Sequence, residues 1–161
     1  MMAYDIDFTP SLTCGNFMVN DAKMRVLMGP VGSGKSVTSS FEVIRRASQQ
    51  EPNKYGIRKS RAAVVRETAR QLMDTTIKTF LDWFPPGICG EYMRTTKTYF
   101  FKVGDIECEV MFRALDDADD VRNLNSLELT FAWFNECRDI HPDIIDAMSK
   151  RVGRYPSKKD G

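Results

Sequence analysis

The chain has 161 residues, which is enough for one domain with a sizeable core, and its 42% hydrophobic and 28% charged residues exclude a disordered or fibrous protein. No apolar run approaches the roughly 20 residues that span a bilayer, and the start lacks the pattern of a secretory signal, so we expect an intracellular protein. The formal net charge of +1 lacks the basic excess of a dedicated nucleic-acid-binding module, so any DNA contact would come from a local patch.

The first half of the chain predicts two strands, each followed by a helix. Residues 1–22 show no sustained periodicity and are interpreted as an irregular lead-in. Residues 24–28 are a short apolar strand that runs into a glycine-rich turn, after which apolar residues recur at helical spacing up to residue 47. Residues 62–65 are a second strand, apolar on both faces as in a buried parallel sheet. A helix is predicted from about Thr68 to Trp83, where a Pro-Pro-Gly sequence ends it.

The second half predicts a β-hairpin, a loop, a strand and a last helix. Residues 96–103 and 106–113 flank a Gly-Asp turn, and residues 106–113 alternate in polarity, which is typical of a hairpin. The polar stretch 116–126 is interpreted as a loop, residues 129–134 as an apolar strand, and Pro142 as the start of a helix that runs to about Val152. Alternating strands and helices predict an α/β fold with a mainly parallel sheet, as one domain over residues 23–161.

A phosphate-binding loop is the strongest signal in the sequence. The pattern G-x-x-x-x-G-K-[ST] is matched at every position by Gly29, Pro30, Val31, Gly32, Ser33, Gly34, Lys35 and Ser36. Glycines let successive backbone N–H groups point into one concavity, and the following helix N-terminus adds positive field. Lys35 would reach the β- and γ-phosphates of ATP, and the Ser36 hydroxyl would bind Mg²⁺. A chance match is expected in about 0.5% of chains this long; the alternative is a glycine-rich turn with an incidental lysine.

A second half of the site is predicted where the strand at residues 129–134 ends. Glu136 follows the strand tip and is placed to act as the general base that polarises a water against the γ-phosphate. Asn135 stands where Asp is usual, and its amide oxygen would accept a hydrogen bond from a metal-bound water without adding negative charge. The alternative is a buried strand that happens to end in polar residues.

Five stretches in order resemble the ATPase domain of the phage terminase large subunit, and together they cover most of residues 24–156. They are Met28–Ser36, Val64–Thr68, Phe112–Asp116, Leu127–Glu136 and Arg151–Pro156. The resemblance implies a P-loop NTPase of the ASCE type with a β-hairpin insertion. Its activity would be Mg²⁺-dependent ATP hydrolysis that drives double-stranded DNA into a viral prohead.

The same resemblance implies partners and a place of action. These are double-stranded DNA, the portal protein, a small terminase subunit and a homo-oligomeric ring, in the bacterial host cytoplasm and transiently at the prohead portal, with no membrane. Members also carry a C-terminal nuclease domain. This chain ends 25 residues after Glu136, so we expect an ATPase sheet that is incomplete at the C-terminus, no nuclease, and weak or absent turnover.

An arginine from a neighbouring subunit is also implied by the resemblance, since ring ATPases complete their sites in this way. Arg122, expected in the loop before the acidic strand, matches best. Arg113 is second, and Arg66 after the second strand would instead sense nucleotide or touch DNA. For each, the alternative is a solvated arginine paired with a nearby Asp.

Two other functions stay open: a P-loop small-molecule kinase, for which no arginine-rich lid is visible, and a domain that binds nucleotide without turnover.

Smaller features of the sequence are also ambiguous. Tyr4 and Phe8 either stack on adenine or pack in the core. A set of basic residues is either a strip near DNA or a plain charged surface: Arg138, Arg151, Arg154, Lys158 and Lys159. The four cysteines form no CxxC pair and are expected to be reduced and mostly buried.

Overall fold

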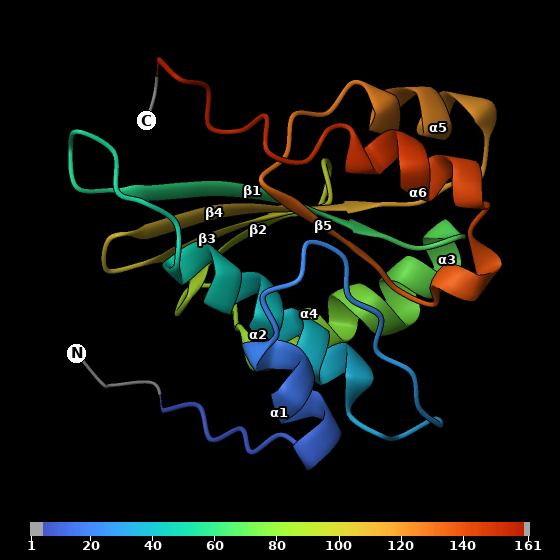
Figure 1. Cartoon of the computed structure of the whole chain (residues 1–161), viewed down its shortest axis with the longest axis horizontal. Coiled ribbons are helices and arrows are strands. Elements are labelled where there is room, and N and C mark those ends of the chain that lie inside the picture. Colours follow the sequence, from blue (N-terminus) through green and yellow to red (C-terminus); the bar gives the residue numbers. More distant parts are fainter. Residues whose placement is uncertain (1–4, 160–161) are drawn as a thin grey trace.

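The computed structural model describes residues 5–159 and shows a central sheet with helices on both faces (Figure 1). The helices are α1 (Leu12–Val19), α2 (Lys35–Ser48), α3 (Ala69–Gln71), α4 (Lys78–Trp83), α5 (Ala118–Asn125) and α6 (Pro142–Ser149). A π-helical segment, η1 (Leu72–Ile77), joins α3 to α4, and a 3₁₀ turn, η2 (Cys137–Asp139), follows the last strand. The strands are β1 (Arg58–Val65), β2 (Gly90–Met93), β3 (Thr98–Val103), β4 (Ile106–Arg113) and β5 (Phe131–Phe134).

The sheet has the strand order β2-β3-β4-β1-β5. Strand β1 runs parallel to β4 on one side and to β5 on the other, so that Ala62 lies opposite both Val110 and Phe131. Strands β2 and β3 extend the sheet in antiparallel fashion beyond β4. The predicted α/β fold with parallel strands, flanking helices and a hairpin is therefore confirmed, and β2 is a strand that the sequence did not predict.

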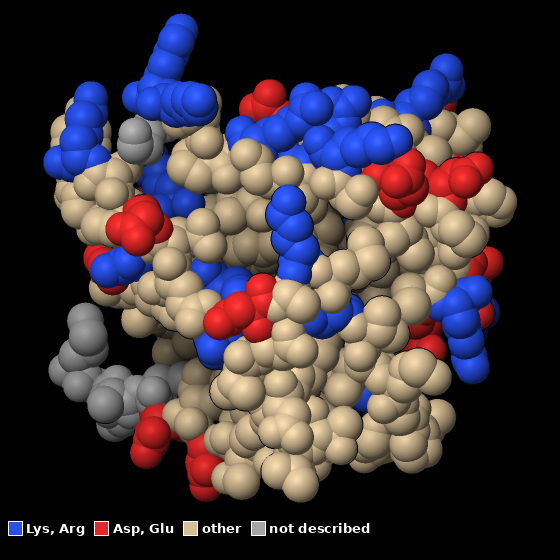
Figure 2. All heavy atoms as spheres, in the orientation of Figure 1, with Lys and Arg blue, Asp and Glu red and all other residues tan. Residues whose placement is uncertain are grey.

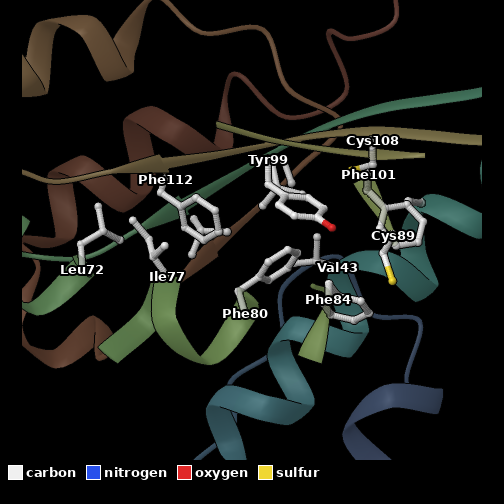
Figure 3. Packing of buried hydrophobic residues seen from close by; sticks show 14 residues of the cluster. Val43, Leu72, Ile77, Phe80, Phe84, Cys89, Tyr99, Phe101, Cys108 and Phe112 are labelled. Carbon is white, nitrogen blue, oxygen red and sulfur yellow. The ribbon is translucent and has the colours of Figure 1, made fainter. Parts of the chain in front are cut away.

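One face of the sheet packs against α2 and α4 and forms the larger core (Figure 3). Alternate residues of β1 and β4 point to this face because side chains of a strand alternate between the two sides of a sheet. Phe80 of α4 lies at the centre and is fully buried. Its ring centroid is 5.4 Å from those of Tyr99 and Phe112, both edge-to-face. This aromatic packing fixes α4 against the hairpin.

The opposite face of the sheet is covered by α5 and α6. Ala63 and Val65 of β1 and Met111 of β4 point to this side and pack with Leu124 of α5 and Met148 of α6. All five side chains are buried. The C-terminal half of β1 is covered on both faces of the sheet. Its side chains are therefore apolar on both faces there, as its sequence predicts.

The prediction of a strand at residues 24–28 is wrong. Among the described residues, no strand of the sheet pairs with this segment. The segment is extended, and its side chains do alternate. Met24, Val26 and Met28 are 66%, 66% and 82% exposed, whereas Arg25 and Leu27 are half-buried. The apolar pattern of a strand is thus present, but one face lacks neighbours. What holds the segment is an ion pair between Arg25 and the buried Glu42 of α2, at 2.8 Å.

Two helices occur where irregular structure was predicted. Residues 1–22 contain α1, whose start is capped by the Ser11 hydroxyl accepting from the backbone N–H of Cys14. The stretch 116–126 contains α5, capped by the Asp117 carboxylate accepting from the N–H of Asp120. In α1 only Cys14 is buried, so its sequence shows no apolar stripe. In α5 the apolar face consists of Val121 and Leu124 alone, which is too short a pattern to indicate a helix among so many polar residues.

The other predicted helices are confirmed with changes at their ends or in their geometry. The helix predicted from Thr68 to Trp83 is present but is interrupted by η1. The last helix ends at Ser149 rather than Val152.

Phe8 stacks on Phe41 of α2 with ring centroids 4.4 Å apart, which supports core packing for that residue, whereas Tyr4 lies outside the described residues. No helix among residues 5–159 is long and apolar enough to cross a bilayer.

Three of the four cysteines are buried, and Cys137 is exposed. Burial raises the pKa of the Cys89 thiol and raises that of Cys108 to about 12, although a hydrogen bond with Ser60 acts in the opposite direction on Cys108. Since the thiolate is the reactive form, these two thiols should be inert in the folded protein.

We expect a thiol reagent at pH 8 to modify one cysteine per chain rapidly in the native protein and all four after denaturation. The measurement is the burst amplitude of a chromogenic disulfide reagent. The Cys137→Ser variant serves as the control and should lose the fast phase. A fast phase that remains after this substitution would show that another thiol is exposed to solvent.

Candidate functional site

The glycine-rich loop has the backbone that its sequence demands. Gly32 and Gly34 adopt φ values of 78° and 82°, which disfavour any residue with a Cβ. Gly34 caps α2, and its carbonyl accepts from the N–H of Thr38 in the first turn. At Gly29 a Cβ would lie 2.9 Å from the Ser33 Oγ, so a larger residue there would displace the Ser33 hydroxyl. Two glycines of the pattern are thus favoured by their backbone conformation, and the third by its close approach to a side chain.

The Lys35 side chain folds back over this loop. Its Nζ donates hydrogen bonds to the carbonyl oxygens of Gly29 and Pro30, each at 2.7 Å, and to the Ser33 Oγ at 3.3 Å. These neutral acceptors satisfy the ammonium group but leave its charge uncompensated. An anionic phosphate would be a stronger partner for the same amine, because hydrogen bonds between ionised groups are about twice as strong as neutral ones.

The loop is supported from one side by α1 and by α2. The buried Cys14 thiol of α1 donates to the Ser33 carbonyl at 3.7 Å. Glu42 of α2 is buried and accepts from Arg25 at 2.8 Å and from Arg46 at 2.6 Å. Arg25 also donates to the Phe17 carbonyl of α1. These contacts tie the segment before the loop to α1 and α2.

The tip of β5 carries Asn135 and Glu136. The Asn135 N–H donates to the Val65 carbonyl at 2.9 Å, so the tip is held against the end of β1. Glu136 adopts φ 55° and ψ 54°, a left-handed conformation that is uncommon for a residue other than glycine. Its half-exposed carboxylate has Arg138, 3.8 Å away, as the cation of its one ion pair in the described structure. Backbone strain of this kind is often found at functional sites, so Glu136 is a candidate on geometry as well as on sequence.

The loop and the strand tip both lie toward the right in the view of Figure 1, the loop lower and the C-terminal end of β5 above it. Among residues 5–159 no hydrogen bond or ion pair joins Lys35 to Glu136; each is engaged within its own segment. That the two act on one nucleotide stays a prediction.

The three candidate arginines differ sharply in their surroundings. Arg122 lies in α5 and not in a loop, is 76% exposed on its side chain, and pairs with Asp119 one turn earlier. Arg113 ends β4; burial lowers its pKa, and its guanidinium donates to the carbonyls of Thr96 and Phe112. Arg66 follows β1, and its Nε is buried without a hydrogen-bond partner among residues 5–159. Arg66 thus has a buried donor free for a ligand next to the strand tips. This makes it a better candidate for contacting a nucleotide than its sequence position alone suggested.

The donor set fits a magnesium–nucleotide complex better than a metal held by protein alone. Within the described range no three His, Cys, Asp or Glu side chains gather to form a metal cluster. Mg²⁺ in nucleotide sites usually keeps several waters and takes one or two protein oxygens together with the phosphates. The Ser36 hydroxyl and the Asn135 amide oxygen are donors of that kind. That the Ser36 hydroxyl and the Asn135 amide oxygen contact the metal or its waters stays a prediction.

Sequence reasoning missed one residue of this neighbourhood, Thr76. It lies in η1, is 1% exposed, and its hydroxyl accepts a 2.8 Å hydrogen bond from the Asn135 Nδ2. A threonine within a helical stretch carries no signal in a single sequence, so only the fold brings it to the strand tip.

Comparisons with known proteins agree with this arrangement. A family model described as phage terminase large subunit matches residues 21–160. Among solved structures, the large terminase from a thermophilic bacteriophage is similar, with a TM-score of 0.64 and 12% sequence identity over 78% of this chain. The chain spans about 30% of the length of that protein. No curated protein matches the sequence. The extent of the family match, over most of the chain, shows that it belongs to the phage terminase large subunit family.

Proposed function

We propose that this chain binds ATP with Mg²⁺ and hydrolyses it to drive double-stranded DNA into a viral prohead. The observation that carries the proposal is the glycine loop at the start of α2, with Gly32 and Gly34 in left-handed conformations and Lys35 above it. Left-handed glycines occur in other turns of this chain as well, so it is their place within the complete G-x-x-x-x-G-K-[ST] pattern, directly before a helix, that supports phosphate binding. Membership of the terminase family supplies the motor role.

Each residue of the site has a role in this proposal. The loop from Gly29 to Gly34 cradles the phosphates, and Lys35 exchanges its carbonyl partners for phosphate oxygens. Ser36 and Asn135 contact the metal and its water shell, and the metal, when bound, neutralises charge on the phosphates. Glu136 accepts the proton of the attacking water.

A complete motor adds groups from outside one chain. An arginine of the neighbouring subunit in a ring, with Arg122 the candidate from sequence, stabilises charge on the phosphates. The portal protein and a small terminase subunit are the proposed protein partners, and the host cytoplasm and the prohead portal the place of action.

A basic surface supports the DNA part of the proposal. Residues 150–159 carry five Lys and Arg and no acidic residue, in a chain with a net charge of +1. Figure 2 shows blue side chains gathered along the upper face, over α6 and the segment that follows it. Charge of this kind attracts the phosphate backbone without regard to sequence.

A domain that binds nucleotide without turnover is the second candidate. Asn135 favours it, since a neutral amide replaces the carboxylate that usually supports the metal at this position. The two candidates differ in whether phosphate is released.

Binding of Mg²⁺–ATP by the Lys35→Ala variant tests the site that both candidates share. We expect the dissociation constant for ATP to rise about 10- to 100-fold, because a hydrogen-bonded charge is lost from the phosphates. Isothermal titration calorimetry measures it. The matched control is Lys78→Ala, which removes an exposed lysine of α4. Equal affinity in the Lys35→Ala variant and the parent would refute a phosphate-binding role for the loop.

A further inference from the structure

Asn135 and Thr76 form a buried polar pair behind the tip of β5. They are 7% and 1% exposed and lie 59 positions apart in the sequence, and the Asn135 Nδ2 donates to the Thr76 Oγ1 at 2.8 Å. The larger core lies on the same side of the sheet, with Leu72 and Ile77 of η1 among its members. A hydrogen bond in such surroundings orients its partners strongly, because breaking it leaves two polar groups without water.

The pair fixes which atom of the amide faces the site. Since Nδ2 is engaged with Thr76, the carbonyl oxygen Oδ1 on the same planar group must point elsewhere. Oδ1 accepts no hydrogen bond from residues 5–159, and it does not belong to the fully enclosed polar atoms that lack a partner. It is therefore open to an incoming donor such as a metal-bound water.

The neighbouring threonine shows that this arrangement is particular to Thr76. Thr75 is exposed, and its hydroxyl donates to the Gln71 carbonyl of its own helix at 2.7 Å. Thr76 lies one residue further along the π-helical turn, where its side chain faces β5 instead. Single π-helical turns are frequently found at functional sites.

Orientation matters here because residue 135 is Asn. Both oxygens of an aspartate accept hydrogen bonds, so rotation of a carboxylate changes nothing for a bound cation. An asparagine presents an acceptor in one orientation and two N–H donors in the other. Donors turned toward Mg²⁺ or its waters would oppose binding, so the neutral amide needs a partner that holds it one way.

We propose that Thr76 is a positioning residue that holds the Asn135 carboxamide with Oδ1 toward the Mg²⁺ water shell of the bound nucleotide. The inference rests on the proposed nucleotide site. It assigns to Thr76 the role that outer-shell partners have for metal ligands, whose loss typically costs 10- to 100-fold in metal affinity.

The test is a Mg²⁺ titration of nucleotide binding, which does not depend on turnover. At a fixed concentration of a fluorescent ATP analogue, we measure the Mg²⁺ concentration that gives half-maximal binding. Thr76→Val, which removes the hydroxyl and keeps the shape, should raise it about tenfold or more. Thr76→Ser, which keeps the hydroxyl, should stay near the parent. Thr75→Val is the matched control on the exposed side and should also stay near the parent.

A second variant separates orientation from loss of structure. In Asn135→Asp both oxygens accept, so adding Thr76→Val to it should change the Mg²⁺ requirement far less than in the parent. Should Thr76→Val fail to fold, Thr76→Ala takes its place in both series.

The outcomes are distinct from those of the proposed function. Equal Mg²⁺ requirements for the parent and Thr76→Val, or an equal shift in Thr76→Ser, would overturn the positioning role. Unchanged ATP affinity in the Lys35→Ala variant would instead refute the nucleotide site itself.

Discussion

Replacement of Glu136 by Gln is expected to lower the rate of ATP hydrolysis by about 10²- to 10⁴-fold and to leave ATP binding nearly unchanged. Gln keeps the size and hydrogen-bonding reach of Glu but cannot accept the proton of the attacking water. Because the Glu136 side chain is half-exposed and weakly paired with Arg138, its removal should cost little stability. The loss should therefore appear in phosphate release and not in folding.

Phosphate release in the presence of double-stranded DNA and ATP affinity are measured in parallel. Glu128→Gln, an exposed carboxylate just before β5, is the matched control. Hydrolysis by the Glu136→Gln variant at the parent rate would contradict the general-base role. If the parent protein binds ATP but releases no phosphate with DNA present, nucleotide binding without turnover becomes the better description.

Replacement of Phe80 by Ala is expected to destabilise the fold by about 3–5 kcal/mol. The ring is fully buried and contacts Phe84, Tyr99 and Phe112 edge-on or tilted, so its loss leaves a cavity at the junction of α4 and the hairpin. For a domain of this size the midpoint of thermal unfolding should fall by roughly 10 °C.

Urea unfolding followed by circular dichroism measures this change. Phe100→Ala is the control, since Phe100 lies on β3 next to buried Tyr99 and is 41% exposed. We expect the control to lose about 1 kcal/mol or less. Similar losses at the two positions would mean that the cluster around Phe80 does not dominate the core.

Elements with strong local signals could be predicted from the sequence. The glycine loop and α2 carry a motif and an amphipathic repeat, and the apolar end of β1 at residues 62–65 reflects burial on both faces. The hairpin of β3 and β4 shows its Gly-Asp turn, and β4 shows the alternation of a strand. The left-handed Glu136 follows β5 where the strand was expected to end. In each case the residues that specify the element are neighbours in the chain.

The remaining features depend on contacts between distant parts of the chain. Helices α1 and α5 bury one residue each and are capped by Ser11 and Asp117, so neither has the long apolar stripe by which a helix is recognised in a sequence. Residues 24–28 have the pattern of a strand, but pairing requires an adjacent edge, which a pattern cannot supply. The link from Thr76 to Asn135 is likewise a product of the fold, and so is the unpaired Nε of Arg66.

The mixed pairing of the sheet has a consequence for how the molecule forms. Strands β3 and β4 meet across a tight turn, with Val103 opposite Ile106, whereas the junction of β1 and β5 brings together Arg61 and Thr130, 69 positions apart. Closing a long loop costs more chain entropy, and distant pairings form more slowly. We expect a chain emerging from the ribosome to complete its hairpin well before β5 docks. Asn135 and Glu136, which follow β5 directly, would therefore take their places only in this later step.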